Sequence, residues 1–146
     1  MPTLNISWMT LHDHASALAG LLARQGPWRG IVAVSRGGLV PAAIVARALD
    51  IRLVEAVAIA SYDDRVRGDV QVLNATPRDA AGWLIIDDLA DTGATARVVL
   101  ALRPQAHYAV LYAKPRGQPF VDTFFSAVAQ DVWIEFPWDQ APPIVK

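Results

Sequence analysis

The chain contains no cysteine, and this absence excludes disulfide bonds, thiol nucleophiles and thiolate metal ligands together. Such a composition fits a reducing compartment. No apolar run reaches the roughly 20 residues that a membrane-spanning helix needs, and residues 1–7 lack the basic and apolar regions of a secretion signal. We therefore expect a cytoplasmic protein with no integral membrane segment, while peripheral attachment to the inner membrane face stays open.

A large charge of one sign is also missing, because the formal net charge of the 146 residues is −1. Binding to DNA or RNA normally needs a basic face, so we expect no nucleic-acid partner. Neither Gly-x-x-x-x-Gly-Lys-Ser/Thr nor Gly-x-Gly-x-x-Gly occurs, which disfavours nucleoside triphosphatases and dehydrogenases. The chain is instead 53% hydrophobic and 18% charged, without a linker-like segment. This composition predicts a single domain, residues 1–146, with a packed core.

Apolar residues at three- and four-residue steps after Ser7, a potential cap, predict a helix over 8–24. Short apolar runs and further helical patterns then alternate, which predicts strands over 30–34, 53–60, 83–86, 107–113 and 124–128, and helices over 40–49 and 92–102. Polar residues between these elements predict a mobile loop at 61–69 and a turn at 87–91. We therefore expect an α/β fold, with a mostly parallel twisted sheet and helices on both of its faces.

In such a sheet, ligands bind beyond the carboxyl ends of the strands, where helix N-termini point free N–H groups outward. Segment 84–95 has an apolar strand followed by the paired carboxylates of Asp87 and Asp88. A helix then opens with Thr92, Gly93, Ala94 and Thr95. Its backbone donors, hydroxyls and dipole suit a phosphate monoester, and the carboxylates suit sugar hydroxyls and a cation such as Mg²⁺. This segment could therefore hold both ends of a ribose phosphate.

A purely structural interpretation of this segment stays open. Asp91 could cap the helix, and Asp87 and Asp88 could be solvated loop residues, because aspartate is common at caps and turns.

A second loop, 34–41, follows a strand and combines Arg36 with Gly37 and Gly38. Glycines let a backbone approach oxyanions closely and arginine is a permanent cation, so pyrophosphate fits this loop. The alternative is a glycine-rich turn with a surface arginine.

The order of strand, carboxylate pair and Thr-Gly-x-Thr turn in 84–95 resembles the signature of the type I phosphoribosyltransferases. With the loop 34–41, Ala-Lys-Pro at 113–115 and the segment 131–139, nearly the whole chain is similar to the bacterial purine phosphoribosyltransferases that act on xanthine and guanine. The resemblance implies the type I phosphoribosyltransferase-like fold with a small C-terminal hood for the base, at about 114–146. It also implies phosphoribosyl pyrophosphate and a 6-oxopurine base as substrates, Mg²⁺ as cofactor, and a homo-oligomer, a tetramer.

By the same resemblance, Arg36 and Gly37 would hold the pyrophosphate. Asp87 and Asp88 would hold the ribose hydroxyls, and Asp88 would also bind the metal. The 5-phosphate would lie on Asp91, Thr92, Gly93, Ala94 and Thr95. Asp87, Asp88 and Asp91 are the implied catalytic residues, and Asp91 would serve as a general base near the imidazole side of the purine.

For the base, the resemblance implies stacking on Trp133, a hydrogen bond from Lys114 to the 6-oxo group, and reading of the 2-position by the main chain of Ile134. A lysine at the 6-position would reject adenine, because the amino group there would leave a buried donor unsatisfied. Taken singly, Trp133 could be a core aromatic residue and Lys114 a surface lysine.

Two departures from the family pattern affect the implied site. Gly68 stands where the family has its loop arginine, so Arg67 or Arg65 would have to close over the pyrophosphate. Ala94 replaces a glycine common in the phosphate turn, which is tolerable if its φ is negative. Two other functions stay open: a phosphoribosyltransferase that prefers hypoxanthine and guanine, and a non-catalytic regulator that senses phosphoribosyl nucleotides.

Overall fold

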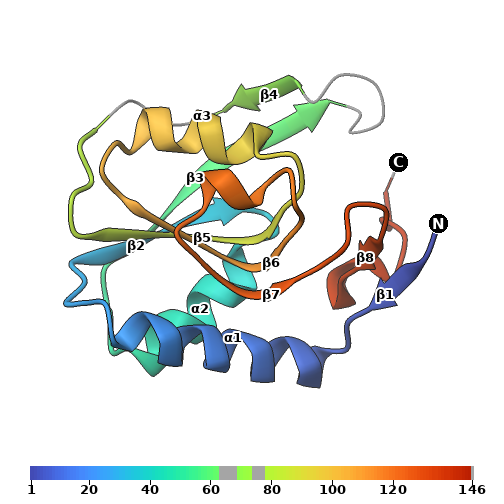
Figure 1. The fold of residues 1–146 in the computed structure, drawn as a ribbon, viewed down its shortest axis with the longest axis horizontal. Coiled ribbons are helices and arrows are strands. Elements are labelled where there is room, and N and C mark those ends of the chain that lie inside the picture. Colours follow the sequence, from blue (N-terminus) through green and yellow to red (C-terminus); the bar gives the residue numbers. More distant parts are fainter. Residues whose placement is uncertain (63–68, 74–77, 146) are drawn as a thin grey trace.

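The structure is a computed structural model that describes residues 1–62, 69–73 and 78–145. A six-stranded sheet with the order β4-β3-β2-β5-β6-β7 forms its centre, and a two-stranded sheet of β1 and β8 lies beside it (Figure 1). The central strands are β2 (Gly30–Ser35), β3 (Val54–Tyr62), β4 (Asp69–Val72), β5 (Trp83–Ala90), β6 (His107–Ala113) and β7 (Thr123–Ala127).

The central sheet is mostly parallel, as predicted. Strand β2 pairs in parallel with β3 and β5, β5 pairs with β6, and β6 pairs with β7. Only β3 and β4 are antiparallel among the described pairs, with Ser61 opposite Val70 and Tyr62 opposite Asp69. The ends of the segment expected to be a loop, 61–69, are therefore strand. Residues 63–68, the rest of that segment, lie outside the described part of the chain.

Helices cover both faces of this sheet, which confirms the predicted α/β fold. Helices α1 (Trp8–Ala23) and α2 (Leu39–Ala48) pack on one face, and α3 (Ala94–Leu102) packs on the other, above the sheet in Figure 1. Ser7 is the N-cap of α1, since its side chain accepts a hydrogen bond from the backbone N–H of Thr10. The predicted start of this helix is confirmed.

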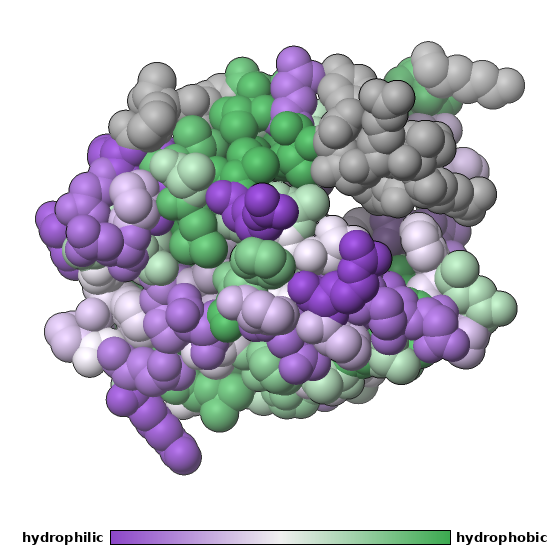
Figure 2. Space-filling view, turned by 45° about the horizontal axis from the view of Figure 1, so that its top comes forward, coloured by the Kyte–Doolittle hydropathy of each residue, from purple (hydrophilic) through white to green (hydrophobic). Residues whose placement is uncertain are grey.

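Apolar side chains of the strands alternate between two core layers, which explains why the strands are apolar throughout. In β2, Ile31 and Ala33 point to the α1 and α2 side, whereas Val32 and Val34 point to the α3 side. Figure 2 brings the α3 side forward and shows hydrophobic residues gathered over the upper part of that face, with hydrophilic residues bordering them. Among the described residues, no helix is both long enough and apolar enough to cross a membrane.

The two ends of the chain form the small sheet. Strand β1 (Thr3–Asn5) pairs in parallel with β8 (Trp133–Glu135), and a 3-10 helix, η2 (Pro137–Asp139), follows. Phe136 and Trp138 stack at 4.9 Å between ring centroids, and the ring of Trp138 meets Trp8 of α1 edge-on at 6.1 Å. These ring contacts hold the C-terminal segment against α1. The sequence did not predict β1, because a three-residue strand has no readable periodicity.

Candidate active site

The acidic pair lies inside strand β5 rather than in a turn. The expected strand over 83–86 and turn over 87–91 are wrong in their boundaries, because β5 continues to Ala90 in parallel pairing with β6. This pairing keeps the backbone extended through both aspartates. Asp87 is only 6% exposed and Asp88 is half-buried. The interpretation of both as solvated loop residues is therefore wrong.

The two carboxyl groups lie side by side where burial disfavours their charged forms. Burial raises the pKa of Asp87 well above its usual value, and the charge of Asp88 adds to the effect. Burial also raises the pKa of Asp88 to about 6, with a further contribution from the charge of Asp139. The backbone N–H of Asp88 donates to Oδ1 of Asp87 at 2.8 Å, and the hydroxyl of Tyr108 donates to Oδ2 at 3.4 Å. A bound cation would relieve the repulsion in this pair.

The loop between β2 and α2 meets these carboxylates. A Cβ built on Gly37 would lie 2.6 Å from Cγ of Asp88, so the backbone of this loop touches the acidic pair. A Cβ on Gly38 would overlap the carbonyl oxygen of Ile86. Only glycine fits at either position without displacing a neighbour. Arg36 is exposed at the start of the loop.

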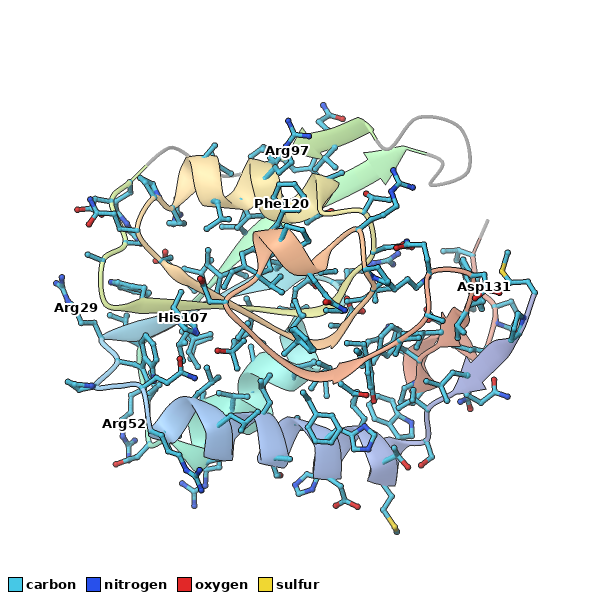
Figure 3. The ribbon with its side chains drawn as sticks, viewed as in Figure 1. Arg29, Arg52, Arg97, His107, Phe120 and Asp131 are labelled. Carbon is cyan, nitrogen blue, oxygen red and sulfur yellow. The ribbon has the colours of Figure 1, made fainter. Side chains whose placement is uncertain are left out.

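The turn between β5 and α3 depends on a glycine with positive φ. Gly93 has a φ of 88°, and the ring of Phe120 fills the space that a side chain at Gly93 would need. Figure 3 shows Phe120 beside α3, and the guanidinium of Arg97 lies 5.8 Å from the ring centroid. Phe120 therefore packs under the turn and fixes its position. Sequence reasoning gave Phe120 no role, because its contact with Gly93 depends on the fold.

Helix α3 begins at Ala94, later than predicted, so Thr92 and Gly93 form the turn before it. Gly93 is the N-cap and no side chain caps the helix, so the interpretation of Asp91 as a cap is wrong. The hydroxyl of Thr92 accepts a hydrogen bond from the backbone N–H of Ala94 at 3.3 Å. Ala94 is a helical residue and does not have a positive φ, so it meets the condition for replacing a glycine. Thr95 is half-buried in the first turn, whose N–H groups have no partner within the helix.

Lys114 is buried, with 4% of its surface exposed, so the interpretation as a surface lysine is wrong. Its Nζ donates to Oδ2 of Asp91 at 3.3 Å, and its backbone N–H donates to the carbonyl of Ala90 at 2.9 Å. Nε2 of Gln130 donates to the other carboxylate oxygen of Asp91, Oδ1, at 2.7 Å. Sequence reasoning missed Gln130, because it lies in a loop and belongs to no recognisable motif.

Trp133 and Ile134 lie in β8 on opposite faces of the strand. Trp133 is 50% exposed, so the interpretation as a core aromatic residue is wrong. Ile134 is buried, and its backbone pairs with Leu4 of β1. The exposed indole is available as a flat surface, while the main chain that carries it is held by strand pairing.

The residues described include no group of three or more His, Asp or Glu side chains arranged to hold a metal. The adjacent carboxyl groups of Asp87 and Asp88 are the candidate ligands. Mg²⁺ usually takes one or two carboxylates together with waters and substrate oxygens, so this pair fits a Mg²⁺ site completed by substrate. Arg65 and Arg67 lie outside the described residues.

Comparison with known proteins gives consistent matches. The model of the phosphoribosyl transferase domain matches residues 7–143, which include every candidate site residue from Arg36 to Ile134. The chain is 53% identical over 135 residues to the xanthine-guanine phosphoribosyltransferase of Nitratidesulfovibrio vulgaris, covering 92% of this chain and 83% of that protein. It is 48% identical over 141 residues to the xanthine-guanine phosphoribosyltransferase of Chromohalobacter salexigens, covering 97% and 86%. The crystal structure of a purine phosphoribosyltransferase from Pyrococcus horikoshii Ot3 matches with a TM-score of 0.78 at 28% identity, covering 100% of this chain and 99% of that one.

Proposed function

This chain belongs to the phosphoribosyltransferase family, and on that premise we propose the reaction that it catalyses. Its fold is that of the type I purine phosphoribosyltransferases. It is a purine salvage enzyme that transfers ribose 5-phosphate from phosphoribosyl pyrophosphate to guanine or xanthine, and more weakly to hypoxanthine. The products are GMP or XMP and pyrophosphate.

The contact between Gly37 and Asp88 is the observation that carries this proposal. Phosphoribosyl pyrophosphate has a phosphate at each end of a ribose, so its site needs two anion-binding loops with groups for the sugar hydroxyls between them. The N-terminus of α3 suits the 5-phosphate, with Asp91, Thr92, Gly93, Ala94 and Thr95 as its contacts. The loop of Arg36 and Gly37 suits the pyrophosphate. Asp88 touches the pyrophosphate loop at Gly37, and both aspartates lie in β5 shortly before the 5-phosphate turn, so the pair suits the ribose hydroxyls.

The reaction is a displacement at C1 of the ribose. The bond from C1 to the pyrophosphate oxygen breaks, the bond from C1 to N9 of the purine forms, and the imidazole ring of the purine gives up a proton. We assign Asp91 as the acceptor of that proton, and a carboxylate in this role contributes about 10²–10⁴-fold. The acidic pair, which is proposed to hold the ribose hydroxyls, favours the positive charge that develops on the sugar. Arg36 balances the charge of the leaving pyrophosphate.

Mg²⁺ is part of this proposal, with Asp88 as its protein ligand beside Asp87. When bound, the ion supplies neutralisation of the pyrophosphate, which is worth several kcal/mol of transition-state stabilisation. The raised pKa values of both aspartates support a site built for a cation, since burial disfavours their charged forms, and the charges of Asp88 on Asp87 and of Asp139 on Asp88 add to the effect. We also assign Arg67, in the undescribed segment, as a contact to the pyrophosphate.

Lys114, Trp133 and Ile134 are the proposed contacts to the base. A buried ammonium on Lys114 can donate to a 6-oxo group, and it faces the same region as Asp91, to which it is bonded. The half-exposed indole of Trp133 can stack on the purine, and the main chain of Ile134 can read the 2-position. The C-terminal segment 114–146 therefore acts as the hood over the base within the single domain 1–146. We also propose that the protein is a homotetramer in the cytoplasm.

A panel of guanine, xanthine, hypoxanthine, adenine and uracil, assayed by pyrophosphate release with Mg²⁺, tests the proposed function. We expect the highest kcat/KM for guanine and xanthine, a lower value for hypoxanthine and negligible use of adenine. A higher value for hypoxanthine than for xanthine would favour a hypoxanthine-guanine enzyme. Equal or greater use of adenine would contradict the assignment of Lys114. Tight nucleotide binding in calorimetry without pyrophosphate release from any base would favour a sensing regulator.

A further inference from the structure

We propose that Gln130 is a positioning residue that fixes Asp91 in line with the base, an inference that rests on the proposed function. The side-chain amide of Gln130 forms hydrogen bonds through both its nitrogen and its oxygen. Nε2 donates to Oδ1 of Asp91 at 2.7 Å and to the backbone carbonyl of Asp91 at 3.3 Å. Oε1 accepts from the backbone N–H of Arg116 at 2.9 Å.

Asp91 needs such an anchor because of its position. It lies in the turn before α3, outside strand and helix, and 48% of its side chain is exposed. A carboxylate in such a turn samples several rotamers unless hydrogen bonds select one. Among the described residues, Gln130 and Lys114 are the side chains that donate to it.

The two donors differ in whether they also bond to the purine base. In the proposed complex Lys114 donates to the 6-oxo group of the purine, so its 3.3 Å contact with Asp91 must be shared with the base. Gln130 is not among the proposed contacts to the base. Its shorter hydrogen bond can hold Asp91 in place while the base binds and while the carboxylate takes up a proton.

The same amide also sets the distance between the two groups that face the purine. The N–H groups of Gly117 and Gln118 both donate to the carbonyl of Lys114, at 2.9 and 3.0 Å, so Arg116 lies in a tight turn with Lys114. By accepting from the N–H of Arg116, Gln130 ties this turn to Asp91. It thereby acts on the imidazole edge and the 6-oxo edge of the base together.

The isosteric variant Gln130→Glu separates these contacts. Its carboxylate still accepts from Arg116, but an oxygen replaces Nε2 and faces Oδ1 of Asp91. At neutral pH we expect about a 10-fold rise in the KM for guanine, as for loss of one charge-assisted hydrogen bond. The KM for phosphoribosyl pyrophosphate should change less than about twofold, because Gln130 bonds to Asp91 and the other proposed contacts of the 5-phosphate, Thr92 to Thr95, keep their places.

Gln130→Ala loses both contacts, so its KM for guanine should rise at least as much. Gln25→Glu and Gln25→Ala are matched controls, because Nε2 of Gln25 donates to Oγ1 of Thr123 at 3.1 Å and does not reach Asp91. Both controls should keep unchanged KM values. Thermal unfolding of every variant separates folding defects from positioning.

An unchanged KM for guanine in Gln130→Glu would overturn the inference while leaving the proposed function intact. Equal KM changes for both substrates would also overturn it, because a general structural role predicts that result. An unsubstituted protein with no transferase activity would overturn the proposed function, and this inference with it.

Discussion

Gly37 faces the carboxyl group of Asp88 so closely that a Cβ on the glycine would lie 2.6 Å from Cγ of the aspartate. Gly37 lies in the loop that follows β2, and Asp88 lies in β5, the parallel neighbour of β2 in the sheet. Their contact joins the proposed pyrophosphate loop to the proposed ribose and metal site. The distance between the two anion-binding loops is therefore fixed by the sheet rather than by any flexible segment.

Gly37→Ala should reduce activity far more than stability. The side chain of Asp88 can rotate away from the new Cβ, so the fold should survive, but a carboxylate moved by about 1 Å can cost about 100-fold in kcat/KM. Steady-state kinetics and thermal unfolding measure the two effects. Gly38→Ala provides the contrast, because its Cβ would overlap the backbone carbonyl of Ile86, which cannot rotate away. It should destabilise the fold by about 1–3 kcal/mol.

Gly20→Ala, in α1, is the control for both glycine variants, since nothing lies within 4 Å of a Cβ there. It should keep full activity and gain up to about 1 kcal/mol of stability. Full activity in Gly37→Ala would mean that the carboxylate position in this structure does not matter for turnover.

Asp88→Asn should lower kcat by at least about 100-fold, because the amide removes a metal ligand and the negative charge that binds it. Circular dichroism should be unchanged, since the amide has the same shape. Magnesium titration of the activity and of the melting temperature provides the measurement. Asp13→Asn, at a carboxylate whose side chain is 72% exposed, is the control and should behave as the unsubstituted protein. Near-normal turnover in Asp88→Asn would contradict the assignment of Asp88 as a metal ligand and as a contact to the ribose hydroxyls.

The metal-free protein should lose stability, relative to Asp88→Asn, as the pH rises. The pKa of Asp88 is 3.8 in its ordinary state and about 6 in the folded protein, so between these values the folded state holds a proton that the unfolded chain has released. Folding is therefore favoured at the acid end of this window and disfavoured above it. The melting temperature of Asp88→Asn minus that of the unsubstituted protein should grow across the window.

Chelator-treated protein, melted across that pH range, provides the measurement. Magnesium should then raise the melting temperature of the unsubstituted protein above the window, where the carboxylates are ionised, and should have little effect on Asp88→Asn. A melting-temperature difference that narrows with rising pH would be inconsistent with a raised pKa of Asp88.

Trp133→Leu should raise the KM for guanine by about 5–100-fold, the range expected when one base loses an aromatic stacking partner. The KM for phosphoribosyl pyrophosphate should stay the same. Stability should change little, because the indole is 50% exposed. The strand is held through its backbone, where the N–H of Trp133 donates to the carbonyl oxygen of Pro2 at 2.8 Å. Trp133→Phe keeps an aromatic face, so its KM for guanine should rise less. Identical kinetics for the leucine and phenylalanine variants would argue against stacking.

Much of the fold could be predicted from the sequence, because its signals are local. The alternation of apolar runs with helical patterns predicted the parallel strands and the helices, and β6 (His107–Ala113) has the bounds expected. The end of β5 was placed too early, since aspartates are uncommon in strands and Asp87 was assigned to a turn. Pairing with β6 overrides that preference.

The sequence by itself determined the residue types at the site: an acidic pair after an apolar run, a glycine that permits positive φ before a helix, and a lysine at the end of another strand. Those features depend on neighbours along the chain. Tertiary structure alone decided that Asp87 and Lys114 are buried, that Trp133 is exposed, and that Gln130 binds Asp91. Burial and hydrogen bonding at these positions come from segments far apart in the chain that the sheet brings together, and no local pattern contains that information.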